Sequence, residues 1–101
     1  MALKKHELTI SPAAMQDIQD GIDYYKKIDH KLGKRFLEAV KSSFRELQAN
    51  PYYQIKYEFV RIRTVKNFPY LIHFIVEGNT VEVHGVRFDK MENQKVNLKD
   101  K

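Results

Sequence analysis

The sequence predicts an α+β domain with the element order β-α-α-β-β-β, in which a helical hairpin covers one face of an antiparallel sheet. Apolar residues recur at steps of three and four before Asn50, which is the period of an amphipathic helix. After Phe59 they alternate at steps of two, which is the period of a half-buried strand. Short turn segments separate the runs, so we expect neighbouring elements to pack antiparallel.

The composition limits the organisation and the partners of the chain. With 101 residues there is room for one core, and we expect a single domain over residues 1–88 followed by a polar tail over 89–101. Eighteen Lys and Arg against 13 Asp and Glu give a net charge of +5, which favours an acidic partner, either nucleic acid or protein. The chain has no cysteine, which excludes disulfides, thiol catalysis and cysteine-ligated zinc.

No stretch of the sequence approaches the roughly 20 apolar residues needed to span a bilayer. The first ten residues also lack the apolar region of a secretory signal. We therefore expect a cytoplasmic protein that has no membrane partner.

The first strand and the first helix are predicted from the N-terminal third of the chain. The segment from Lys4 ends in the alternation of Leu8 and Ile10, which indicates a short strand with one buried face. Ser11 is a good N-cap, and Pro12 occupies the first helical position, where its missing N–H costs nothing. The apolar stripe of this helix consists of Ala14, Ile18, Ile22, Tyr25 and Ile28.

A second, longer helix follows after a short interruption at Asp29 and His30. Its apolar stripe steps by three or four until proline forbids continuation at Pro51. Because the link is short, the two helices should form an antiparallel hairpin with both stripes facing the same sheet. The stripe consists of Leu32, Phe36, Val40, Phe44 and Leu47.

The remaining elements are strands. Residues 51–57 carry three tyrosines and no clean period, so we expect a loop over the sheet edge. Three runs with strand composition follow, at 59–65, 70–76 and 80–88. The turns at 66–69 and 77–79 are short enough to make them an antiparallel meander.

The candidate binding residues begin with two arginines on one strand. Arg61 and Arg63 are two apart, so their side chains share a face, and we expect that face to be the exposed one. Val60 and Ile62 would then point toward the helices. Lys66 and Arg87 would extend this face into a basic groove that holds phosphates or carboxylates bidentately. An ordinary solvated polar face explains the same pattern.

Two histidines and several tyrosines are further candidates. His73 and His84 lie in the middle of strands, where an acid-base role is one interpretation and a local hydrogen bond the favoured one. We identify no carboxylate at a spacing that would orient either ring. Tyr70, like the tyrosines of residues 51–57, could stack on a base or anchor a peptide, although we expect most tyrosines to cap the core. The histidines show no metal-ligand spacing, so we expect no metal and no cofactor.

The order and spacing of four segments resemble the RelE/ParE superfamily of bacterial type II toxins. The resemblance covers about residues 6 to 88. Its segments are ISPAAMQDIQDGIDYY, FLEAVKSSFRELQANPYY, VRIRTVKNFPYLIHF and VEVHGVRF. It implies a small toxin neutralised by a cognate antitoxin, whose C-terminal segment covers the toxin's groove or helices in a hetero-oligomer.

The resemblance leaves two targets open. RelE-like members cut messenger RNA on the ribosome, whereas ParE-like members poison DNA gyrase and are not nucleases. Many members carry a histidine with adjacent arginines, or a catalytic tyrosine, near the end of the last strand. This sequence has Phe88, Asp89, Lys90 and Met91 there. The helical hairpin and the long strand containing Phe-Pro-Tyr are more ParE-like.

We therefore favour a gyrase-binding toxin that is not an enzyme. The alternatives are a ribosome-dependent mRNA endoribonuclease and a degenerate member that binds a partner without toxicity. RNA cleavage requires a base, an acid and cations, and the arginines supply only the cations. His84 or Tyr70 would then have to serve as acid or base. The catalytic candidates are Arg61, Arg63, Arg87 and His84, and the target- or phosphate-binding candidates are Arg61, Arg63, Lys66, Tyr70, His73 and Arg87.

Overall fold

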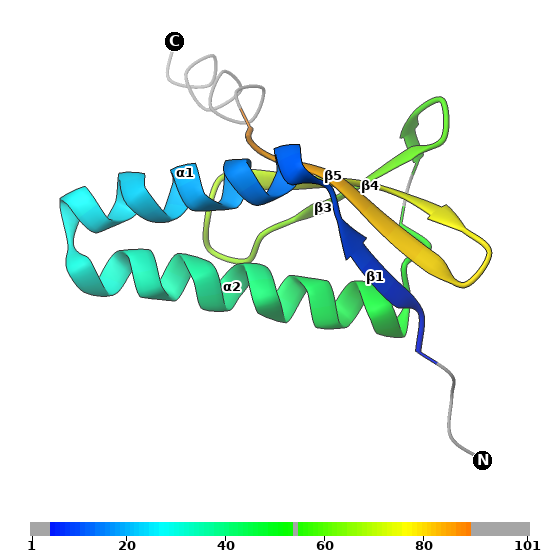
Figure 1. The fold of residues 1–101 in the computed structure, drawn as a ribbon, viewed down its shortest axis with the longest axis horizontal. Helices are drawn as coiled ribbons and strands as arrows, with labels where there is room; N and C mark the ends of the chain where they lie inside the picture. Colours follow the sequence, from blue (N-terminus) through cyan, green and yellow to red (C-terminus); the bar gives the residue numbers. More distant parts are fainter. Residues whose placement is uncertain (1–4, 54, 90–101) are drawn as a thin grey trace, which may run out of the picture.

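The computed structural model describes residues 5–53 and 55–89, except for the side chain of Lys56. Two helices lie on one face of a five-stranded sheet with the strand order β1-β5-β4-β3-β2 (Figure 1). The tail expected over 89–101 lies outside the described residues from residue 90 onward. The elements are β1 (Glu7–Ile10), α1 (Pro12–Ile28), α2 (His30–Ala49), β2 (Ile55–Tyr57), β3 (Val60–Thr64), β4 (Tyr70–Glu77) and β5 (Thr80–Phe88).

The α+β class, the helical hairpin and the β3-β4-β5 meander are confirmed. The expectation of a wholly antiparallel sheet is wrong, because β1 pairs parallel with β5. Leu8 lies opposite Val81 and Ile10 lies opposite Val83. Alternation of apolar residues predicts which face of a strand is buried, but it carries no information about strand direction.

The loop expected over residues 51–57 contains a further strand. Within it, β2 pairs antiparallel with β3 and places Ile55 opposite Arg61. A three-residue strand with an irregular register is too short to show a period of two, which is why the pattern missed it. The turn from β2 to β3 holds Glu58 at φ 47°, a backbone conformation that favours glycine.

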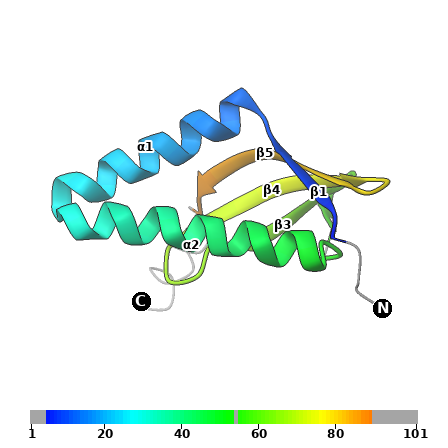
Figure 2. The same cartoon turned by 60° about the horizontal axis from the view of Figure 1, so that its bottom comes forward.

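The two helices are joined by a single residue. Asp29 ends α1 by donating its backbone N–H to the Tyr25 carbonyl, and its carboxylate accepts from the Lys31 N–H at 2.9 Å to cap α2. At the other end of α1, Ser11 Oγ accepts from the Ala14 N–H at 3.0 Å, as expected for an N-cap. The helices run antiparallel, and their connecting turn lies beyond the end of the sheet (Figures 1 and 2).

Two glycines allow the helices to approach closely. A Cβ added at Gly33 would lie 3.0 Å from the Ile22 carbonyl oxygen. One added at Gly21 would lie 2.5 Å from Cε2 of Phe36, a buried side chain. The hairpin therefore depends on these two glycines, a role that the sequence pattern did not indicate.

The core lies between the helices and the sheet. Phe36 and Leu47 of α2 are fully buried, as are Ile72 and Phe74 of β4. The turn between β3 and β4 is anchored in this core, because the Phe68 ring centroid lies 5.2 Å from that of Phe36. Neither helix within the described part of the chain is long and apolar enough to cross a membrane.

Candidate functional site

The two arginines of β3 lie on the opposite face from the one expected. Arg61 is opposite Phe74 and Arg63 is opposite Ile72, and residues directly opposite in an antiparallel pair share a face. Both β4 partners are fully buried beneath the helices. The arginines therefore lie on the helix-covered face, and Ile62 lies on the open face. The expected orientation is wrong because β3 is near the sheet edge, where long side chains reach solvent past the helices.

Both arginines contact the segment that follows α2. Arg61 Nη1 donates to the Tyr53 carbonyl at 2.6 Å, and its guanidinium lies 5.5 Å from the Tyr52 ring centroid. The Arg63 guanidinium lies 5.0 Å from the Tyr53 ring centroid and forms an ion pair with Glu46. The hydrogen bond to Glu46 raises the pKa of Arg63. These contacts hold residues 52–53 and the end of α2 against the sheet.

His84 has a carboxylate neighbour that the sequence analysis overlooked. Its Nε2 lies 3.5 Å from Glu82 Oε1 on the same strand. Residues two apart on a strand share a face, so the spacing was present in the sequence. The pair is exposed, with side-chain exposures of 51% and 37%, and such a pair orients a ring only weakly.

His73 and Arg87 lie on the open face of the sheet. His73 is opposite Gly85, and its ring centroid is 6.4 Å from that of Tyr57. Arg87 is opposite Leu71 and is exposed. Its side chain lies over Gly85, where an added Cβ would be 3.0 Å from Arg87 Nε. These two candidates therefore share a face with each other but not with the β3 arginines.

A feature that the sequence analysis missed fixes α1 to the edge of β5. β1 pairs with β5 only as far as Val83, so among the described residues the next part of that edge has no strand partner. Asp17 Oδ2 accepts from the Val86 N–H at 3.0 Å, and Ser11 Oγ donates to the His84 carbonyl at 3.3 Å. The side chains of Asp17 in α1 and of its N-cap Ser11 thus pair with backbone groups of β5 beyond the end of the β1 pairing.

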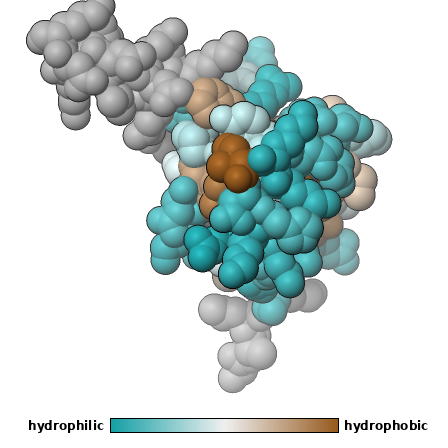
Figure 3. Space-filling view, turned by 90° about the vertical axis from the view of Figure 1, so that its left-hand side faces the viewer, coloured by the Kyte–Doolittle hydropathy of each residue, from teal (hydrophilic) through white to brown (hydrophobic). Residues whose placement is uncertain are grey.

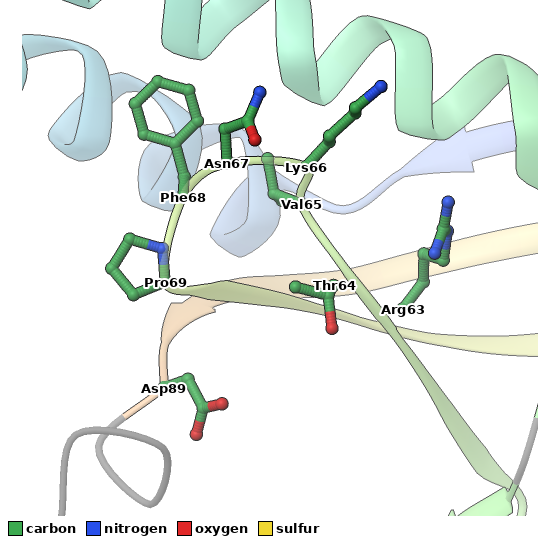
Figure 4. Close-up of a pocket in the computed structure, with 8 residues that line it drawn as sticks. All are labelled: Arg63, Thr64, Val65, Lys66, Asn67, Phe68, Pro69 and Asp89. Atoms are coloured by element: carbon green, nitrogen blue, oxygen red, sulfur yellow. The ribbon is translucent and has the colours of Figure 1, made fainter. Parts of the chain in front are cut away.

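Lys66 belongs to the turn between β3 and β4. This turn forms one wall of a hollow of about 400 Å³, which Arg63 and Asp89 also line. Figure 4 shows Arg63 and Lys66 on the α2 side of the chain, whereas the side chain of Thr64 points the other way. The hollow therefore brings together two of the predicted binding residues.

Tyr70 belongs to the core. Its ring centroid lies 4.9 Å from that of Phe36 and 6.1 Å from that of Tyr25. Burial, reinforced by nearby Tyr24 and Asp20, raises the pKa of Tyr70. Burial also raises the pKa of Tyr25. A half-buried phenol packed in this way is mainly a structural element of the aromatic cluster.

The candidate residues are distributed over separate places. Arg61, Arg63 and Lys66 lie on the helix side, whereas His73 and Arg87 lie on the open face. Within residues 5–53 and 55–89, no group of three or more His, Cys, Asp or Glu side chains could hold a metal ion. The arrangement offers cationic surfaces on two sides of the sheet rather than one site that combines acid, base and cations.

The sequence model of the family described as ParE toxin of type II toxin-antitoxin system, parDE, matches residues 8–93. The chain belongs to the ParE family. This membership confirms the resemblance to the RelE/ParE superfamily and places the chain on its ParE side. No curated protein matches the chain.

A solved structure of the chromosomal ParDE toxin–antitoxin system from P. aeruginosa shares the fold of this ParE-family chain. The TM-score is 0.67 at 20% sequence identity, and the match covers 85% of this chain and 98% of the other. At this identity the likeness concerns the fold alone. The fold thus recurs in a protein of very different sequence.

Proposed function

We propose that this ParE-family toxin arrests growth by binding DNA gyrase and is neutralised by a cognate antitoxin in the cytoplasm. The observation that carries the proposal is the distribution of the candidate catalytic residues. RNA cleavage needs a base, an acid and cations within hydrogen-bond reach of one phosphate. Separate basic surfaces on a rigid scaffold are better suited to gripping a macromolecule than to cleaving one.

The contacts of the β3 arginines support a mode of action without cleavage. Arg61 already donates to the Tyr53 carbonyl, and Arg63 is paired with Glu46. Each guanidinium therefore already shares its donors with groups of the same chain. The Glu46 carboxylate beside Arg63 also offsets part of the positive charge that would stabilise a phosphate in a transition state.

The antitoxin is proposed from family membership and charge. A chain of net charge +5 fits an acidic partner, and the ParE family is defined by toxins of type II toxin–antitoxin systems. We expect a hetero-oligomer of toxin and antitoxin. A small acidic protein encoded in the neighbouring reading frame would support this assignment directly.

A supercoiling assay tests the gyrase proposal. Purified chain is added to DNA gyrase, ATP and relaxed plasmid, and supercoiled product is measured on agarose gels. We expect inhibition that rises with toxin concentration and disappears when a heat-unfolded sample replaces the folded chain. Full supercoiling at saturating toxin would overturn the proposal.

One observation favours the ribonuclease alternative. The exposed His84–Glu82 pair could act as a base, and Arg87 lies three residues further along the same strand. Induction of the chain in a bacterial host, followed by primer extension on abundant messengers, tests this. Ribosome-dependent cuts that vanish in His84→Ala and Arg87→Ala would establish cleavage. Normal growth on induction would instead support the non-toxic family member.

A further inference from the structure

The turn of the helical hairpin carries most of the net charge of the chain. Residues 26–35, which we call the hairpin tip, run from the last turn of α1 into the first two turns of α2. They contain five Lys and Arg and one Asp, a formal charge of +4, compared with +5 for all 101 residues. All five cationic side chains are exposed. They are Lys26, Lys27, Lys31, Lys34 and Arg35.

The carboxylates in and beside the hairpin tip do not pair with its cations. Asp29 caps α2 by accepting from the Lys31 backbone N–H at 2.9 Å. Asp23, just before the tip, accepts from Gln19 Nε2 at 2.9 Å. Among the described residues, the salt bridges are Arg63–Glu46 and His84–Glu82, so neither these two carboxylates nor Glu38 forms one with a tip cation. The positive charge of the tip is therefore available to a ligand.

Cations from both helices surround two adjoining hollows at the hairpin tip. The smaller hollow has a volume of about 250 Å³, and its polar lining consists of Lys26, His30 and Lys34. The other, of about 480 Å³, shares Lys26 and His30 and adds Lys27 and Asp23. Gly33 brings the helices together here, because a Cβ added to it would lie 3.3 Å from Lys26 Cβ. Positive groups that converge on one hollow from two helices suit an anionic group such as a phosphate.

The hairpin tip is a firmly held, projecting end of the molecule. Asp29 is the single residue between the helices, and it closes α1 with its backbone N–H and caps α2 with its carboxylate. The turn lies beyond the end of the sheet (Figures 1 and 2). Figure 3 looks onto this end and shows a mainly hydrophilic face broken by a small hydrophobic spot. The charged surface is thus open to a ligand much larger than the hollows themselves.

The composition of the hairpin tip favours a nucleic acid over a protein or a membrane. Lysine supplies four of the five cations, and lysine is depleted in protein–protein interfaces but common on phosphates. A membrane-bound helix needs a broad exposed apolar face. Here the apolar stripes pack on the sheet, and Ile28, at 61% exposure, is the exposed large hydrophobic residue of the tip.

The hairpin tip also favours duplex DNA over a single strand. Proteins that bind single strands stack the bases on aromatic side chains. Residues 26–35 contain no Phe, Tyr or Trp on which bases could stack. Duplex DNA presents closely spaced phosphates on its outside, and binding them requires cations but no stacking platform.

We propose that the hairpin tip binds the phosphate backbone of duplex DNA. Lys26 and Lys34 hold a phosphate at the hollow between the helices, and Lys27 and Lys31 reach phosphates on either side. Binding is independent of base sequence, because phosphate contacts carry no sequence information directly. The proposal concerns DNA alone, and it stands or falls independently of gyrase inhibition.

Fluorescence anisotropy tests the proposal. Purified chain is titrated into a labelled duplex of about 20 base pairs, and the affinity is measured between about 20 and 80 mM NaCl. Four cation–phosphate contacts predict a slope of about −3.6 in log K against log salt, which is a loss of about 100-fold over this range. No binding at about 20 mM NaCl with up to about 100 μM chain would overturn the proposal.

Two double variants separate the hairpin tip from the overall charge of the chain. Lys26→Gln/Lys34→Gln should weaken binding at about 20 mM NaCl by about tenfold or more, and Lys34→Gln alone should lower the salt slope by about 1. The control Lys5→Gln/Arg45→Gln makes the same change in net charge at two exposed cations outside the tip. It should change the affinity by less than about threefold. Equal loss in the two double variants would overturn the proposal.

Three further ligands test the choice of duplex DNA. A single strand of the same length should bind more weakly than the duplex, because its charge density is lower. Vesicles containing phosphatidylserine and a polyglutamate peptide, each at the same concentration of negative charge, should also bind more weakly. Tighter binding of any of the three than of the duplex would overturn the proposal.

Amide chemical shifts locate the bound DNA. With isotopically labelled chain, the duplex should shift the amides of Lys27, His30 and Lys31 most. Shifts confined to β5, around Arg87, would overturn the proposal. Circular dichroism melts of each variant show whether it remains folded, so that loss of binding is distinguished from loss of structure.

Discussion

Two groups of basic side chains lie on either side of α2, and they differ in what they contact. Arg61 and Arg63 of β3 are bound to carbonyl, ring and carboxylate groups of the same chain. Within residues 5–53 and 55–89, the cations that line a groove on the outer flank of α2, namely Lys31, Lys34, Arg35 and Arg45, form no salt bridge. The neighbouring residues Arg45 and Glu46 mark the boundary, since Arg45 lines the groove and Glu46 pairs with Arg63. A basic residue with an internal partner stabilises the fold, whereas one without is available to a ligand.

The largest effect is expected where α1 packs against α2. Gly21→Ala places a methyl group 2.5 Å from the Phe36 ring, so α2 must shift or Phe36 must leave its position. We expect a loss of about 2–3 kcal/mol in the free energy of unfolding, despite the better helix propensity of alanine. Urea denaturation measures it. Gly78→Ala is the control, because φ is +60° there but no atom lies within 4 Å of an added Cβ.

Gly78→Ala should lower the free energy of unfolding by less, about 1 kcal/mol, because alanine is strained in this backbone conformation. An unchanged stability in Gly21→Ala would show that the hairpin can open at this point. It would also show that the position of α2 relative to α1 is adjustable.

Arg63→Ala tests whether the β3 arginines have a structural role. It removes an ion pair with Glu46 and a ring contact with Tyr53, which together are worth about 1 kcal/mol. Thermal melts at low and high salt measure the loss, and Arg63→Lys should recover only part of it because lysine lacks the planar guanidinium. Unchanged stability in Arg63→Ala would remove the distinction between the two basic groups.

Alkaline pH tests the aromatic cluster that anchors the turn between β3 and β4. The pKa values of Tyr25 and Tyr70 are raised in the folded state above the ordinary value of 10.0. Their contribution to stability is therefore fully present below pH 10 and is lost as the pH rises through the folded pKa values. Urea denaturation across this range should show the decline. Tyr70→Phe should reduce it, and an equal decline in that variant would exclude Tyr70 as a cause.

The smallest effect on stability is expected in the groove. Arg35→Glu/Arg45→Glu should change the free energy of unfolding by less than about 0.5 kcal/mol, since both side chains are exposed and neither has an ion-pair partner in the described structure. Urea denaturation beside Arg63→Ala gives the comparison directly. A loss as large as that of Arg63→Ala would mean that the groove cations also hold the fold together.

Much of the candidate site was visible in the sequence, but its geometry was not. Arg61, Arg63, Lys66 and Arg87 were recognised as a set of cations able to bind an acidic partner. Their faces could not be assigned, because Val60 and Ile62 alternate with the arginines and an apolar pair normally predicts the buried side. Tyr52, Tyr53 and Glu46 supply the partners that reverse this choice, and all three are distant in sequence from the residues they contact.

The sequence by itself determined the local elements of this protein. Helical spacing, the Ser11 cap and Pro51 delimit the helices, and short turns make the meander, because these features depend on neighbours within a few residues. Tertiary structure alone decided that β1 runs parallel to β5, that β2 exists, and that the β3 arginines lie beneath the helix side of the sheet. These outcomes depend on which distant groups offer a hydrogen bond or a covering surface, and spacing along a chain does not encode them.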